Sequence, residues 1–155
     1  MKKAFLIFGL FVSVFAFSAN SFAQKQIQQQ VQRDPVLEAD AKHNLEVAQN
    51  YFRLKKAYRA VLMRFEETFA AYPDYSRMDE FLYMAGMSSF YLSNNKGKQK
   101  LNAEATEDDK KKYDPAKLRE DAKMYLTMLV EKYPQSSFKS EAGKTLKELE
   151  ATEKK

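Results

Sequence analysis

The stretch FEETFAAYPDY, residues 65–75, has the composition of a helix that ends at a tyrosine–proline pair. Proline disfavours the helical conformation of the residue before it, so a helix is expected to end at this point. The stretch YLTMLVEKYPQSS, residues 125–137, has a tyrosine–proline pair in the same setting. Since Pro73 and Pro134 lie 61 residues apart (134 − 73), the chain is expected to use one structural unit twice.

Apolar side chains recur at helical spacing before and after both prolines, and they predict five helices. Asp34-Pro35 and Asp114-Pro115 mark the starts of the first and fourth helices, because aspartate caps a first turn and proline fits its first position. No run alternates with period two, so the sequence predicts an all-α fold. The predicted buried positions are Leu37, Ala41, Leu45, Ala48 and Phe52; Tyr58, Val61, Leu62, Phe65, Phe69 and Tyr72; Phe81, Leu82, Ala85, Ser89 and Leu92; Leu118, Ala122, Tyr125, Leu126, Leu129, Val130 and Tyr133; and Phe138, Ala142, Leu146 and Leu149.

The sequence also predicts how the helices are connected and capped, and how many neighbours the third and fifth helices have. RLKK, residues 53–56, offers a turn between the first two helices without a glycine. Ser76 is expected to cap the third helix, and Ser136 or Ser137 the fifth. The third helix is apolar most of the way round, so it is expected to have neighbours on more than one side. The fifth has one narrow apolar stripe, which is typical of a helix that closes a stack.

The two ends of the chain and one internal segment set the domain organisation. Residues 1–23 have two lysines, an apolar run and a small-residue site, which predict a cleaved secretory signal peptide. A transmembrane anchor is the alternative, but the apolar run is short for a bilayer crossing. Residues 24–33 read as a Gln-rich spacer, and residues 34–155 as one helical domain. Within that domain, residues 94–113 lose the helical pattern and are predicted to be a mobile polar insert.

Composition argues against several kinds of chemistry. The chain has no cysteine, which excludes thiolate and zinc–thiolate sites and gives no residue for an N-terminal lipid anchor. Without Lys2 and Lys3, 24 basic and 21 acidic side chains leave a net charge of +3 (24 − 21), weak support for nucleic acid. His43 is the only histidine and has no second ligand beside it. No catalytic or metal residue, cofactor or small-molecule substrate is therefore predicted, and the chain is not expected to be an enzyme.

Two helix pairs with the same ending resemble the tetratricopeptide repeat, a pair of antiparallel helices that needs a neighbour to bury its apolar face. Gly86 and Ala122 match the small residues that let paired helices approach closely, whereas Gln49 and Val61 replace them in the first unit. The predicted fold is thus a short tetratricopeptide-like solenoid of antiparallel helix pairs with a C-terminal capping helix.

The aromatic segments and the charged insert narrow this resemblance. YF…AYRAVLMRFEETFAAYPDY, DEFLYMAGMSSF and YDPAKLREDAKMYLTMLVEKYPQSSFKSEAGKTLKELE are similar in order and spacing to the early repeats of the BamD-like (YfiO/ComL) outer-membrane assembly proteins. The resemblance covers about residues 36–149. It implies an all-helical envelope protein that acts as a scaffold in outer-membrane protein assembly.

In repeats of this kind the first helix of each pair lines the concave side, which implies a protein-binding groove. The groove residues expected by repeat spacing are His43, Glu46, Asn50 and Arg53 from the first unit, and Tyr83, Met87 and Phe90 from the second. An exposed patch of tyrosine, methionine and phenylalanine is typical of a protein contact surface. The alternative, equally weighted, is that these three side chains are buried against the insert or the final helix.

The sequence therefore predicts an exported, periplasmic scaffold that binds a protein or peptide and that can associate with the outer membrane through its partner. The alternative function is a periplasmic peptide-holding chaperone or a coordinator of envelope enzymes. Neither nucleic acid nor a direct lipid anchor is expected. One stoichiometric membrane partner would favour the scaffold, and many unfolded clients would favour the chaperone.

Overall fold

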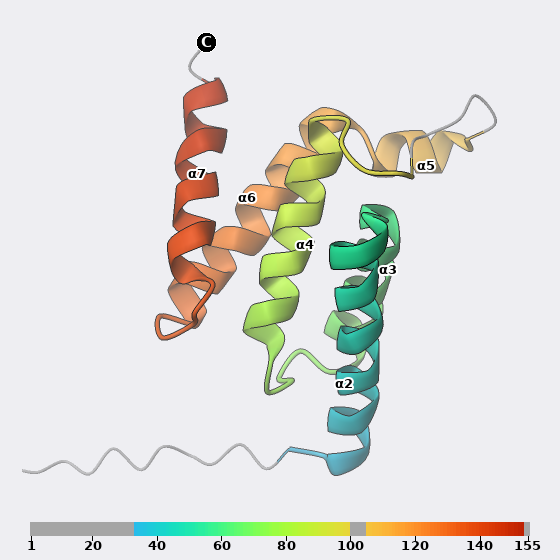
Figure 1. Ribbon diagram of the computed structural model, residues 1–155, viewed down its shortest axis with the longest axis vertical. Helices are drawn as coiled ribbons and strands as arrows, with labels where there is room; N and C mark the ends of the chain where they lie inside the picture. Colours follow the sequence, from blue (N-terminus) through green and yellow to red (C-terminus); the bar gives the residue numbers. More distant parts are fainter. Residues whose placement is uncertain (1–32, 100–104, 154–155) are drawn as a thin grey trace, which may run out of the picture. The chain divides into compact units, whose positions relative to one another are not determined.

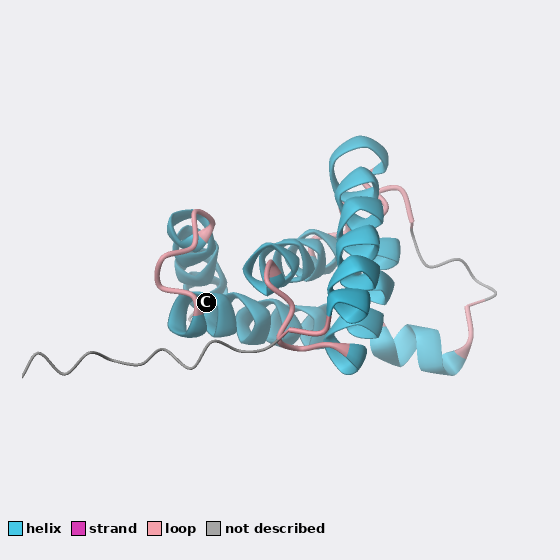
Figure 2. Cartoon of the chain, turned by 90° about the horizontal axis from the view of Figure 1, so that it is seen from below, coloured by secondary structure: helices cyan, strands magenta, loops and turns pink. Residues whose placement is uncertain are grey.

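The computed structural model describes residues 33–99 and 105–153, and these residues form helices without a strand (Figures 1 and 2). The helices are α2 (Pro35–Asn50), η1 (Tyr51–Lys55), α3 (Tyr58–Ala71), α4 (Met78–Ser93), α5 (Glu107–Lys112), α6 (Pro115–Lys132) and α7 (Lys139–Glu153). The all-α prediction is confirmed. The predicted signal peptide and nearly all of the spacer lie outside the described residues. None of the helices in the described ranges has the length and apolar character to cross a bilayer.

Both Asp-Pro pairs begin helices as the sequence predicts. The Asp34 carboxylate accepts hydrogen bonds from the backbone N–H groups of Val36 and Leu37, at 2.8 and 3.4 Å. The Asp114 carboxylate accepts in the same way at the start of α6, at 2.9 and 3.2 Å. In each case the proline takes the first helical position, where no N–H donor is needed.

The two tyrosine–proline pairs also end their helices alike. The Tyr72 N–H donates to the Thr68 carbonyl at 2.8 Å, and the Tyr133 N–H donates to the Leu129 carbonyl at 2.9 Å. Both tyrosines have left the helical conformation, as expected for a residue before proline. The repeated ending predicted from the sequence is confirmed.

The first helix pair turns later than the sequence suggests. Residues 51–55 continue α2 as the π-helix η1, and the turn falls at Lys56, which has a left-handed conformation with φ of 49°. The Ala57 N–H donates to the Tyr51 carbonyl at 3.0 Å across this turn. An asparagine or glycine is common at such a position, but here a lysine adopts it.

α4 is the central helix, with α3, α6 and α7 packed against it (Figure 1). Thirteen of its residues are buried, which confirms the prediction of neighbours on more than one side. Gly86 faces α6 as expected, since a Cβ atom placed on it would lie 3.5 Å from the Ala122 backbone oxygen. The core therefore runs through consecutive helix pairs, as in a tetratricopeptide-like stack.

The predicted caps of the third and fifth helices have different outcomes. Ser76 does not cap α4, because its side chain makes no cap hydrogen bond and its N–H donates to Glu38 on α2 at 3.2 Å. Ser136 does meet the first turn of the last helix, where its hydroxyl oxygen accepts from the Phe138 N–H at 3.3 Å. Ala142 and Leu149 bury the narrow stripe of α7, with Leu146 partly buried.

Both described parts of the insert predicted at residues 94–113 make polar contacts with α3, and the mobility of the insert stays a prediction. The Gln99 side-chain oxygen accepts from the Ala60 N–H at 3.1 Å, in the first turn of α3. Asp109 pairs with Arg59 at 3.4 Å, and Tyr113 is buried. Polar contacts to α3 and the buried Tyr113 ring hold these segments, and helical periodicity along the sequence does not reveal such contacts.

Candidate functional site

The four groove residues predicted on the first unit are all exposed. His43, Glu46 and Asn50 lie on α2, and Arg53 lies on η1. Of these, Arg53 reaches the second unit, since its guanidinium lies 3.6 Å from the carboxylate of Glu80 on α4. The structure therefore joins one predicted residue to a residue that the sequence did not single out.

Glu80 is the centre of a polar cluster between the two units. Its side chain is only 7% exposed, yet it lies beneath the guanidinium groups of Arg53 and Arg77, which are 65% and 48% exposed. The Gln49 amide donates to one carboxylate oxygen at 2.6 Å, and Arg77 donates to the other. A buried carboxylate needs such partners to offset its lost hydration.

This cluster leaves several N–H donors in position at the surface. A guanidinium has five N–H donors in a planar fork, and one carboxylate cannot occupy all those of two arginines. With two positive groups and one negative, the cluster has a net charge of +1. It can therefore offer fixed donors to carbonyl or carboxylate groups of a partner. Gln49, expected only to loosen the first helix pair, is the residue on α2 that completes it.

Tyr83, Met87 and Phe90 do not form the exposed patch that the groove hypothesis requires, because all three are buried. The Tyr83 ring stacks on Phe138 with 4.7 Å between centroids. The Met87 sulfur accepts from the Thr145 hydroxyl of α7 at 3.4 Å. The alternative reading, burial against the final helix, therefore describes Tyr83 and Met87.

Burial also changes the acidity of tyrosines on this side of α4. Burial is the largest cause of the raised pKa of Tyr83, and a hydrogen bond to the Glu141 carboxylate is the next. The pKa of Tyr91 is raised by burial and then by the charges of Glu141 and Glu148 on α7. The acidic side chains of α7 thus favour the protonated form of both hydroxyls, and the Tyr83 hydroxyl donates to Glu141.

Two aromatic side chains near the junction of η1 and α4, Phe52 and Tyr91, are half-buried. The Phe52 ring centroid lies 6.3 Å from that of Tyr83 and 6.1 Å from that of Tyr91. The Lys96 ammonium lies 5.8 Å from the Tyr91 ring centroid. The candidate surface is therefore the pair of arginines over Glu80 together with Phe52, which directly precedes Arg53, whereas Tyr91 contacts Phe52 about three turns further along α4. Phe52 was expected to be core and Tyr91 only to widen an apolar stripe, because spacing alone does not distinguish a half-buried ring from a buried one.

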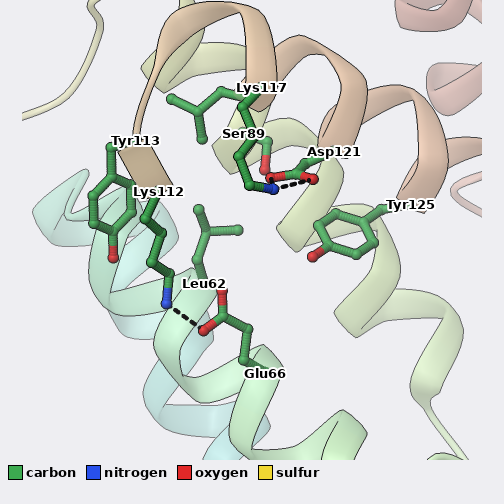
Figure 3. Close-up of a pocket in the computed structure, with 9 residues that line it drawn as sticks. Leu62, Glu66, Ser89, Lys112, Tyr113, Lys117, Asp121 and Tyr125 are labelled. Carbon is green, nitrogen blue, oxygen red and sulfur yellow. Dashed lines mark hydrogen bonds and ion pairs between the residues drawn. The ribbon is translucent and has the colours of Figure 1, made fainter. Parts of the chain in front are cut away.

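A separate small cavity of about 130 Å³ lies between α3, α4, α5 and α6 (Figure 3). The Lys112 ammonium pairs with Glu66 at 2.6 Å, and the Lys117 ammonium pairs with Asp121 at 3.0 Å. The Ser89 hydroxyl is buried and lacks a hydrogen-bond partner. Each lysine is thus matched by a carboxylate. The cavity has room for ordered water.

The described residues contain no group of three or more potential metal-ligating side chains. His43 is exposed on α2. The expectations of no catalytic residue, metal or cofactor remain predictions from the sequence.

Residues 20–152 match the family described as YfiO: Outer membrane lipoprotein. The matched range covers most of the 155 residues and includes every described helix except the last residue of α7. It confirms the resemblance that the aromatic segments and the insert indicate. No curated protein and no solved structure matches the chain.

Proposed function

Because the chain belongs to the YfiO family of outer membrane lipoproteins, we propose that it is a protein-binding scaffold of the cell envelope that acts in outer-membrane protein assembly. Its partner binds to the surface made by α2, η1 and α4, where Arg53 and Arg77 lie over Glu80. The observation that carries this proposal is the exposed pair of guanidinium groups held by one buried carboxylate.

The composition of this surface suits a folded partner. Arginine and aromatic side chains are enriched among the residues that dominate binding energy in protein interfaces. Phe52 supplies apolar area next to Arg53, and Arg77 supplies a guanidinium that is already hydrogen-bonded to Glu80. Fixing donors before binding lowers the entropy that association must overcome.

The same surface argues against the chaperone alternative. A protein that holds many unfolded clients needs a broad, exposed apolar surface. Tyr83, Met87 and Phe90 were the residues that could have supplied it, and they are buried. The proposal therefore favours one specific partner.

The proposed location is the periplasm, at the inner side of the outer membrane. Family members are described as lipoproteins, but the 155 residues contain no cysteine to which a lipid could be attached through a thioether. Attachment through a membrane-bound partner is then the means by which this chain would be held there.

A photo-crosslinking amino acid at Asn50 tests the proposal, with Met63 of α3 as the control position, since both residues are exposed. We expect position 50 to capture one membrane-associated protein in cells, and position 63 not to capture it. Arg77→Ala should reduce that capture. Arg64→Ala is its matched control, because Arg64 pairs with Glu67 at the same three-residue spacing on α3.

Three results would count against the scaffold. Many unrelated crosslinked proteins at position 50 would support the chaperone. Equal capture from positions 50 and 63 would show that the surface is not specific. If the Arg77→Ala variant captured the partner as well as the wild type, the arginine cluster would not be part of the binding site.

A further inference from the structure

A groove of about 650 Å³ lies between the end of α6 and α7. The floor includes small residues, and a Cβ atom placed on Gly143 would have nothing within 4 Å. The backbone of α7 is therefore open to close approach from outside. The groove is lined by Val130, Ser136, Ser137, Lys139, Ser140, Gly143, Lys144 and Lys147.

The 61-residue repeat spacing relates this groove on α7 to the face of α4 that packs against α6. Gly86 on α4 packs against Leu126 of α6, and the residue 61 positions later is Lys147 (147 − 86). Leu82 on α4 is fully buried, and its counterpart is Gly143 (143 − 82 = 61). The face of α7 that corresponds to the α6-binding face of α4 is thus uncovered within the described residues. Its size and register suit another helix.

The groove is positively charged, so a helix that binds there is expected to have acidic side chains. Lys139, Lys144 and Lys147 are exposed, and their ammonium groups make no ion pair or hydrogen bond within residues 33–99 and 105–153. In contrast, Lys112 and Lys117 are both paired with carboxylates. No acidic residue lines the groove. The N-terminal end of α7 adds the partial positive charge of a helix dipole at the same place.

We propose that this groove binds an acidic helical segment of a partner protein, which lies along α7 as α6 lies along α4. Carboxylates of that segment pair with the three lysines, and its backbone approaches α7 at Gly143. This surface is separate from the arginine cluster, so the inference does not depend on the proposed function. A second copy of this chain is a poor occupant, because the chain has a net charge of +5, or +3 without Lys2 and Lys3, and would bring further positive charge.

Binding of a designed peptide to the purified full chain tests this inference. The probe is a fluorescein-labelled amphipathic helix of alanine, leucine and glutamate, with a lysine-for-glutamate peptide as the charge control. Fluorescence anisotropy should show binding of the acidic peptide alone. Its affinity should fall with added salt, since exposed charge pairs are screened beyond about 8 Å at physiological ionic strength.

Two variants address the groove directly. The triple variant K139E/K144E/K147E should weaken peptide affinity by about tenfold or more, because charge complementarity becomes repulsion. Its matched control, K42E/K98E/K111E, changes net charge equally at exposed lysines elsewhere and should change affinity by less than about twofold. Gly143→Leu places a side chain where a Cβ atom meets nothing in the fold, so it should block binding without lowering the melting temperature.

A ¹⁵N–¹H titration locates the peptide, with the Gly143 and Ser140 amide signals expected to shift most. The inference is overturned if both triple variants lose affinity equally, or if Gly143→Leu binds like the wild type. It is also overturned if the triple variant loses binding to phosphatidylglycerol vesicles but keeps binding to the peptide. The same holds if the three lysines determine whether the chain forms a dimer. An Arg77→Ala variant should retain peptide binding, which separates this test from that of the arginine cluster.

Discussion

Leu126 of α6 occupies the space that a side chain at Gly86 of α4 would need. A Cβ atom on Gly86 would lie 2.5 Å from Leu126 Cδ2 and 2.6 Å from Leu126 Cγ, closer than any real contact. Leu126 itself is fully buried. The α4–α6 interface therefore depends on the absence of one methyl group.

The first prediction concerns this close approach. Gly86→Ala should lower the free energy of unfolding by roughly 1–3 kcal/mol, because the added methyl group forces Leu126 or the helices to shift. Urea denaturation measures the change. Gly143→Ala is the matched control on α7, where the methyl group meets nothing and should stabilise the helix by up to about 1 kcal/mol. Equal effects of the two variants would contradict the packing argument.

The second prediction separates buried from exposed positions. Phe65→Ala should cost roughly 2–5 kcal/mol in the free energy of unfolding, because it leaves a cavity at a fully buried position between helices. Tyr83→Ala should also be clearly destabilising, since it removes the ring that stacks on Phe138. Met63→Ala is the exposed control and should change stability by less than about 0.5 kcal/mol. If Tyr83→Ala left the free energy of unfolding nearly unchanged, the Tyr83 side chain would have to be exposed.

The third prediction concerns the insert. Deleting residues 96–109 should lower the melting temperature, because the deletion removes Gln99 from the first turn of α3 and Asp109 from Arg59. Gln99→Ala alone should cost about 0.5–2 kcal/mol, as loss of a side-chain acceptor at a helix start usually does. The control is Lys111→Ala, an exposed residue of α5. Thermal unfolding that is unaffected by the deletion would show that these contacts contribute nothing.

The fourth prediction follows from the acidity of Tyr125. Burial, followed by the charges of Asp121 and Glu66, raises its pKa to about 12. An unfolded tyrosine has a pKa of about 10, so between these values the native state retains a proton that the unfolded state has lost. The free energy of unfolding must then fall as the pH rises through this range.

Tyr125→Phe has no such proton, so its free energy of unfolding should fall less steeply than that of the wild type from about pH 10 to about pH 12. Urea denaturation at a series of pH values measures the two slopes. Other tyrosines and lysines titrate in both proteins, so only the difference between the slopes reports on Tyr125. Parallel curves would mean that the hydroxyl is accessible to water.

The sequence by itself determined where most helices begin and end. Asp34 and Asp114 cap through bonds to neighbouring N–H groups, and Pro73 and Pro134 act on the residue directly before them. These effects are local, so their outcome is present in a few consecutive letters. The helical spacing of apolar residues likewise gave most of the core, and the small residue at Gly86 indicated the close approach to α6.

Only the tertiary structure decided which surfaces remain open. Glu80 looks like an ordinary charged residue in the sequence, but in the folded chain three side chains converge on it, from Gln49 on α2, Arg53 on η1 and Arg77 directly before α4. Tyr83 and Met87 are covered because α7 packs back on α4, and no spacing within α4 reveals that contact. Burial of a side chain depends on residues distant in the chain, so a pattern along one helix identifies its apolar face but not what lies against it.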